Sequence, residues 1–234
     1  MAVSTVLLVL NLALNPAPSP ASGAGTCAAE PATSGVGAPA DSALVALYAG
    51  GETFERFLAR ADARRAMWRR HWAEGRVPAD ALATARALGG RWRLLVIAVD
   101  ACSDSVNTIP FIALLVAAVP GLEMRVIAPD AAGALLESRR TPDGRTATPT
   151  VIFLDADGRD AGCWIERPSA LQALAQEARA AGTIERFARG KQAWYDADAG
   201  ASTVREIVEL LVAAASGAPR CGSPPATTPG APID

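Results

Sequence analysis

Cys102 is the residue whose type and position most clearly suggest a chemical role, because it lies between a predicted strand and a predicted helix. Residues Trp92 to Val99 (WRLLVIAV) form a continuous apolar run of strand length, which predicts a strand buried on both faces. Residues 100–105 (DACSDS) follow it and open a predicted helix. Reactions in open α/β sheets gather at the carboxyl ends of strands. A thiolate at a helix N-terminus is stabilised by unpaired backbone N–H groups and by the helix dipole. The sequence therefore predicts that Cys102 is a reactive thiol.

Two prolines follow Cys102 at informative places. Pro110 comes eight residues later, and Thr148-Pro149 directly precedes an apolar strand-like run, residues 150–154 (TVIFL). A DADG turn at residues 155–158 leads to a second predicted strand and so indicates a hairpin. With this order of cysteine, proline, Thr-Pro strand and hairpin, residues 92–181 resemble the thioredoxin-like superfamily.

Three short segments are similar to one bacterial subfamily of thioredoxin-like proteins. That subfamily has a Trp-Cys-Gly-Asp-[Cys/Ser] motif, an Asn-Thr-x-Pro continuation and a later Trp-x-x-Arg-Pro. The matching segments here are residues 102–105 (CSDS), 107–110 (NTIP) and 164–168 (WIERP). The resemblance implies a thioredoxin-like α/β fold: a central mixed sheet flanked by helices, here with extra N- and C-terminal helices.

The resemblance also implies a substrate-docking loop. The family's cis-proline corresponds to Pro149, and the backbone of Thr148 would then pair with an extended substrate beside Cys102. Trp164 and Arg167 are expected to approach the same end of the sheet, where Arg167 would hold a thiolate or carboxylate of a small thiol partner. The expected partners are a protein disulfide or a low-molecular-weight thiol.

The departures from the family pattern shape the expected chemistry. Ser105 stands in place of the resolving cysteine, Ala101 in place of the tryptophan, and Val96 in place of a buried aspartate. A lone thiolate stops at the mixed disulfide until another thiol arrives. Asp104 should stabilise the helix, but its negative charge opposes a thiolate on Cys102. The sequence thus predicts a monothiol exchange protein with Cys102 and Ser105 at its centre. The alternative is a non-catalytic module that binds a protein at the cis-proline groove.

The other three cysteines carry weaker signals. Cys163 lies in the late hairpin strand, where we interpret it as a small apolar side chain rather than a remote resolving thiol. Cys27 and Cys221 lie in Pro- and Ala-rich stretches and would pair with each other only in an exported protein. No two cysteines have a zinc-like spacing, and we expect neither metal nor cofactor.

Hydrophobic periodicity predicts the helices and the further strand that surround Cys102. An Arg- and Trp-rich stretch, residues 51–74, predicts a helix docked on the core rather than a membrane-surface or RNA-binding element. Thr203 and Glu206 predict a capping box that opens the last helix. Further helices are predicted at 78–88, 106–119, 131–139, 169–181, 183–194 and 203–215, and a strand at 122–128. The predicted organisation is a signal-like run and tail (1–40), a helical extension (41–90), the thioredoxin-like core (91–182), C-terminal helices (183–215) and a tail (216–234).

Composition excludes several classes of function. The 234 residues hold 22 Lys and Arg against 24 Asp and Glu, so no basic field points to nucleic acid. A single histidine, His71, argues against a His-rich metal site. Residues 6–14 are apolar but too short to span a membrane, and no Lys or Arg precedes them. Localisation, cytoplasmic or exported, and oligomeric state therefore stay open.

Overall fold

The computed structural model describes residues 41–222, so Cys27 and the N-terminal apolar run lie outside the described residues. Four strands form one sheet in the order β2-β1-β3-β4. β1 pairs in parallel with β2 and antiparallel with β3, and β3 pairs antiparallel with β4. The predicted mixed sheet is confirmed. The strands are β1 (Trp92–Ile97), β2 (Leu122–Ile127), β3 (Thr150–Leu154) and β4 (Asp160–Ile165).

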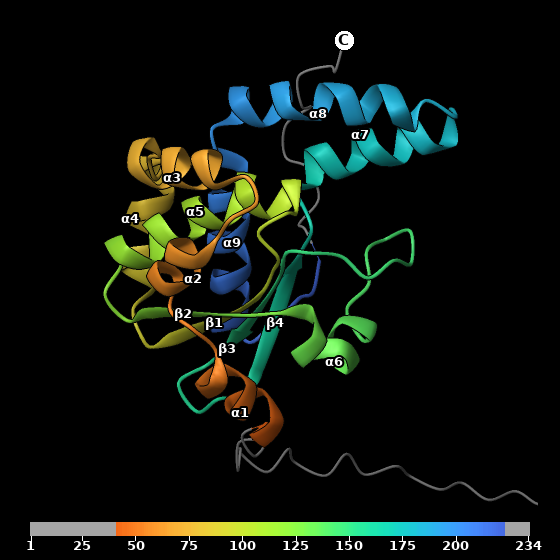
Figure 1. Ribbon diagram of the computed structural model, residues 1–234. Coiled ribbons are helices and arrows are strands. Elements are labelled where there is room, and N and C mark those ends of the chain that lie inside the picture. The colour runs from red at the N-terminus through yellow and green to blue at the C-terminus, as the bar shows by residue number, and fades with distance from the viewer. Residues whose placement is uncertain (1–40, 223–234) are drawn as a thin grey trace, which may run out of the picture. The chain divides into compact units, whose positions relative to one another are not determined.

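Helices precede, interrupt and follow the sheet (Figure 1). Before it come α1 (Ser42–Gly50), α2 (Phe54–Arg60), α3 (Arg65–Glu74) and α4 (Ala79–Leu88). Between strands lie α5 (Ser103–Ala118), the 3₁₀ turn η1 (Pro129–Ala132) and α6 (Gly133–Glu137). After it come α7 (Ser169–Ala180), α8 (Ile184–Asp198) and α9 (Ala201–Ala215).

The sheet has a buried core on each face, as the apolar run of β1 predicts. Leu94 and Val96 of β1 point into one cluster, with side chains from α2–α5 and α9. Leu95 and Ile97 point into the other, with side chains from α1 and α6. Since successive residues of a strand face opposite sides, a strand buried on both faces needs apolar residues throughout.

The Arg- and Trp-rich stretch is two helices rather than one. α2 and α3 are separated by a turn in which Arg64 adopts a left-handed backbone, with a φ of 56°. The turn is held because the Asp100 carboxylate accepts the N–H groups of Asp62 and Ala63 at 2.8 and 3.0 Å. Trp68 of α3 is fully buried, and its indole donates to the Asp100 carbonyl at 3.0 Å. This docked stretch therefore supports the loop that precedes Cys102.

The predicted capping box at the start of α9 is wrong. The helix begins at Ala201, two residues earlier than expected, and Thr203 lies buried within it without a side-chain cap bond. Gly200 caps the helix instead, with a φ of 77°. A Cβ on Gly200 would lie 2.1 Å from the ring of Phe111 in α5, so only glycine fits this close crossing.

The prediction for Cys163 is also wrong. Its side chain is fully buried, as a small apolar residue would be, but it forms a disulfide with Cys221. The backbone of Cys163 donates to the Arg220 carbonyl and accepts from Gly222 N–H, each at 2.9 Å. The residues around Cys221 therefore lie beside β4, which is an edge strand of the four-stranded sheet.

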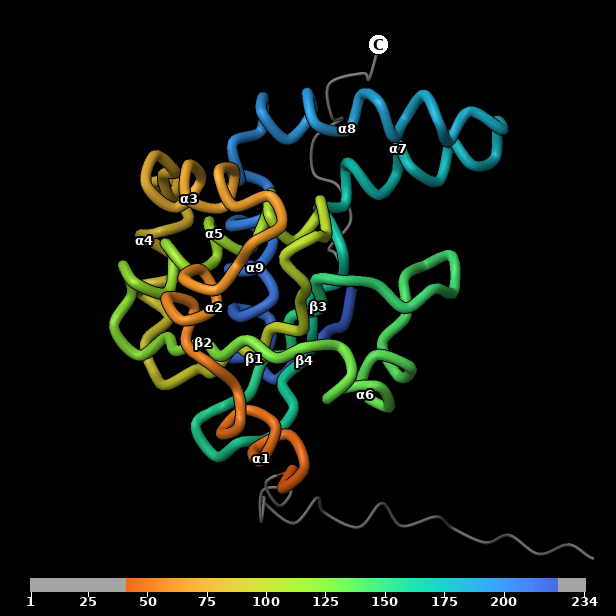
Figure 2. Tube along the Cα trace, viewed as in Figure 1, coloured from red at the N-terminus to blue at the C-terminus, as the bar shows by residue number. Residues whose placement is uncertain are grey.

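The pair α7–α8 is an antiparallel hairpin with its own small apolar cluster (Figure 2). Leu171 and Ala175 of α7 contribute to that cluster, together with Phe187, Trp194 and Tyr195 of α8. The chain enters α7 directly from β4 through residues 166–168 and leaves α8 into α9. This connection brings α8 to the end of the sheet where β1 gives way to α5.

Candidate functional site

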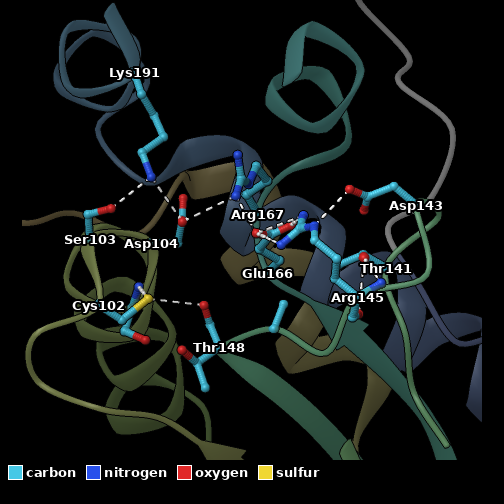
Figure 3. Close-up of polar contacts among 12 residues, drawn as sticks. Cys102, Ser103, Asp104, Thr141, Asp143, Arg145, Thr148, Glu166, Arg167 and Lys191 are labelled. Atoms are coloured by element: carbon cyan, nitrogen blue, oxygen red, sulfur yellow. Dashed lines mark hydrogen bonds and ion pairs between the residues drawn. The ribbon is translucent and has the colours of Figure 1, made fainter. Parts of the chain in front are cut away.

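Cys102 caps the N-terminus of α5. Its Sγ accepts a hydrogen bond from the backbone N–H of Ser105 at 3.5 Å. The same Sγ donates to the carbonyl oxygen of Thr148 at 3.1 Å, and the Thr148–Pro149 peptide bond is cis (Figure 3). The first contact favours a thiolate, because a negative sulfur accepts more strongly from N–H. The second contact is one that the S–H group of a thiol donates.

Asp104, two residues after Cys102, is a buried hub. Its carboxylate accepts from Lys191 Nζ at 3.0 Å and from the Arg167 guanidinium at 3.3 Å (Figure 3). It also accepts from the Tyr195 hydroxyl at 2.7 Å. Burial, and then the negative charge of Asp104, raise the pKa of Tyr195 well above its ordinary value. Tyr195 is therefore a neutral donor at any working pH, and the charge of Asp104 is balanced by the two cations.

A line of alternating charges continues away from Asp104. Arg167 also bonds to the buried carboxylate of Glu166, which accepts from Arg145 at 3.0 Å. Glu166 has a φ of 67°, and its N–H donates to the Pro149 carbonyl at 2.7 Å. Arg145 bonds in turn to Asp143 at 2.7 Å. These contacts tie the helix start at Cys102 to the segment that leads into the cis-proline (Figure 3).

Ser105 occupies the place of a second cysteine, and it is fully buried. Its Oγ has no hydrogen-bond partner within residues 41–222, while its N–H contacts the Cys102 sulfur. Cys102 itself is half-buried and is the free cysteine of the described region. A hydroxyl at position 105 cannot form a disulfide, so Cys102 carries the one sulfur in residues 102–105.

The two residues of the WIERP segment that we singled out lie apart. Arg167 reaches Asp104, as described above. Trp164 is fully buried in β4, and its indole donates to Glu206 of α9 at 2.8 Å. The other oxygen of Glu206 accepts from the N–H and the hydroxyl of Ser169, at 2.7 and 2.6 Å. Trp164 thus fixes the end of β4 to α9 within the core. The loop that carries Arg167 begins directly after this anchored strand.

Four residues of the site carry no local signal that we used. Lys191 and Tyr195 lie on α8, about ninety residues after the cysteine, and Arg145 lies in the loop before the cis-proline. Glu166 stands inside the WIERP segment, between residues already chosen. The sequence offered one usable hint, because Lys191 is the one lysine of the chain.

The described residues form neither a metal-binding cluster nor a membrane-spanning helix. Within residues 41–222, no three His, Cys, Asp or Glu side chains gather in the way a metal ion requires. Over that same range, none of the helices is both long enough and apolar enough to cross a membrane. His71 contacts the Val106 carbonyl through Nδ1 at 2.8 Å and packs against Phe111.

Fold and thiol position together define a thioredoxin-like protein, and the comparisons agree. A family model described as thioredoxin matches residues 51–179, more than half of the chain, so the chain belongs to that thioredoxin family. The match begins ahead of β1 and includes α2–α4.

Two solved structures share the fold at low sequence identity. One is a protein of unknown function from Pseudomonas aeruginosa, 22% identical, with a TM-score of 0.53; the match covers 74% of this chain and 96% of that one. The other is an HIV epitope scaffold, 19% identical, with the same TM-score of 0.53; that match covers 72% and 96%. No curated protein matches the sequence.

Proposed function

We propose that this protein exchanges thiols and disulfides through the single nucleophilic sulfur of Cys102. The observation that carries the proposal is the place of that sulfur. It caps α5 through the Ser105 N–H at 3.5 Å and lies 3.1 Å from the carbonyl of Thr148, the residue before the cis-proline. A thiol between a helix N-terminus and an available backbone edge is suited to meet an extended chain that carries a disulfide.

The proposed reaction has two exchange steps. The Cys102 thiolate attacks one sulfur of a substrate disulfide, a new S–S bond joins them, and the other substrate sulfur leaves as a thiolate. An external thiolate then attacks the substrate sulfur of this mixed disulfide and releases Cys102 as a thiolate again. Ser105 has no sulfur with which to perform the second step, so a protein thiol or a low-molecular-weight thiol must supply it.

The remaining residues position these groups. Thr148 would exchange its bond from the Cys102 S–H for one from a substrate backbone, with Pro149 fixing its orientation. Asp104 and Arg167 hold the start of α5 against the loop after β4, at 3.3 Å from each other. Trp164 supports that loop from the core through Glu206.

The second candidate is a non-catalytic module that binds a protein segment along the same backbone edge. Two observations favour it. Ser105 stands where the resolving sulfur would be, and the Thr148 carbonyl already accepts a hydrogen bond from the Cys102 sulfur. Under this hypothesis the groove beside Pro149 binds a peptide, and Cys102 has the reactivity of an ordinary thiol.

The pH dependence of Cys102 alkylation separates the two. The experiment uses the full chain with Cys27→Ser, oxidised so that the Cys163–Cys221 disulfide is intact, which leaves Cys102 as the thiol to react. We expect a rate midpoint below about 8.5, the pKa of an unperturbed thiol. We also expect a trapped mixed disulfide with an aromatic disulfide reagent, and Cys102→Ser should give neither. A midpoint near the unperturbed value, with no trapped adduct, would support the binding module instead.

A further inference from the structure

We infer that Lys191 of α8 is a positioning residue of the Cys102 site, whose positive charge cancels that of Asp104 beside the reactive sulfur. The inference rests on the proposed function. It makes the α7–α8 hairpin a working part of the site, although its sequence lies after the last strand of the sheet.

The geometry places the Lys191 ammonium over the first turn of α5. Its Nζ lies 2.7 Å from the Oγ of Ser103 and 3.0 Å from the carboxylate of Asp104, the two residues that directly follow Cys102 (Figure 3). The Lys191 side chain is only 16% exposed, and that of Asp104 is 8% exposed. Because both groups are largely removed from water, their charges are weakly screened.

Lys191 balances Asp104 in a way that Arg167 does not. Arg167 is shared, since it bonds both to Asp104 and to the buried Glu166. Tyr195 also donates to Asp104, but it carries no charge, because burial and the neighbouring carboxylate keep its hydroxyl protonated. Without Lys191, Arg167 would be the one cation left in contact with Asp104, and it would still be shared with Glu166, which Arg145 also contacts.

The other charged groups around Cys102 have their own partners. Asp100, in the loop before the cysteine, accepts two backbone N–H bonds, which lower its pKa and keep it ionised. Arg64 donates to the Ala101 carbonyl at 2.8 Å. Arg145 bonds to Glu166, and His71 of α3 contacts a backbone carbonyl of α5. None of these groups is placed to take over the contact that Lys191 makes with Asp104.

The consequence concerns which form of the sulfur is favoured. A like charge nearby disfavours an anion, so an uncompensated Asp104 would hold Cys102 as a thiol at neutral pH. With Lys191 in place, the helix N-terminus acts on the sulfur without that opposition. In the sequence, the negative charge of Asp104, two residues after Cys102, opposes a thiolate on Cys102. The ion pair between Lys191 and Asp104 removes that opposition.

The test measures the pH midpoint of Cys102 alkylation in the Cys27→Ser chain with its disulfide intact. Lys191→Met removes the charge and the donor, and Lys191→Gln removes the charge but keeps a donor, in case the first variant fails to fold. We expect both to raise the midpoint by roughly one pH unit, which is about a tenfold slower alkylation at pH 7. Lys191→Arg should restore the original midpoint.

Two further variants decide the mechanism. Asp104→Asn should lower the midpoint, and adding Lys191→Gln to Asp104→Asn should then have little further effect. Arg189→Met removes an exposed charge from the same helix and should change nothing. If Lys191→Gln lowers the melting temperature but leaves the midpoint unchanged, Lys191 is only a structural anchor and the inference is overturned. If instead the parent chain shows an ordinary midpoint, the proposed function fails, whatever Lys191 does.

Discussion

The indole N–H of Trp164 donates to the carboxylate of Glu206 across 2.8 Å, in the core between β4 and α9. Glu206 is 7% exposed, and burial raises its pKa to about 7 despite the bonds that it accepts from Ser169 and Trp164. A carboxyl group in an unfolded chain titrates near 4.3. The folded protein therefore keeps a proton on Glu206 in a pH range where the unfolded chain releases it.

This difference predicts that stability falls as the pH rises from about 4.5 to about 7. The contribution of Glu206 is complete below that window and is lost above it, by on the order of 3 kcal/mol. Glu206→Gln should flatten this part of the profile, as measured by urea unfolding at pH 5 and pH 8. Glu177→Gln, on the exposed side of α7, is the control and should keep the wild-type slope. An equal slope in Glu206→Gln would rule out this carboxyl as the cause.

A second prediction compares a buried ion network with a surface pair. The side chains of Arg167, Asp104 and Glu166 are 6%, 8% and 5% exposed. Arg167→Met removes one of the two cations that contact each of these buried carboxylates and should cost about 3–5 kcal/mol of unfolding free energy. Arg60→Met breaks an ion pair with Glu52 in which the arginine side chain is 55% exposed, and should cost less than about 1 kcal/mol. Similar losses of unfolding free energy in Arg167→Met and Arg60→Met would contradict the claim that burial makes the Arg167 network the more important one.

A third prediction restores the missing sulfur. Ser105 is fully buried, and its N–H lies 3.5 Å from the Cys102 sulfur, so a thiol at this position would face its partner across one helical turn. Reduction of insulin by the wild-type protein with a dithiol should be weak, and Ser105→Cys should increase it. Ser105→Ala should give no increase. An inactive Ser105→Cys that folds normally would count against the assignment of residues 102–105 as the redox motif.

The fourth prediction concerns the disulfide between Cys163 and Cys221. A cross-link between residues 58 apart in sequence typically stabilises a protein by about 2–4 kcal/mol. Cys221→Ser should lose that amount in denaturant unfolding without reductant. A reductant should bring the wild type down to the level of the variant and leave the variant unchanged. If reductant destabilised both proteins equally, another cause would have to be found.

The sequence was most informative where local chemistry decides structure. The continuous apolar residues of β1 dictate a strand covered on both faces, and the cysteine that follows it caps the next helix. The Asp-Gly turn dictates the β3–β4 hairpin. Each of these signals lies within a few residues of the feature that it specifies.

Long-range pairings could not be predicted in the same way. The motif at Thr203 and Glu206 suits a helix start, but the approach of Gly200 to Phe111 sets that start earlier, and Glu206 is used by Trp164 and Ser169 instead. Lys191 meets Ser103 across 88 residues of chain, a contact that only the packing of α8 creates. Cys163 looked like a small apolar residue because burial and a disulfide leave the same local pattern.

The link between Cys163 and Cys221 closes a covalent ring that contains α7, α8 and α9. A protease that cut the exposed turn at residues 181–183, between α7 and α8, would open this ring without dividing the molecule. The nicked protein would run as one species on a non-reducing gel and as two after reduction. The two helices of the hairpin that carries Lys191 would thus be separated at their turn, yet both would remain part of one covalent molecule.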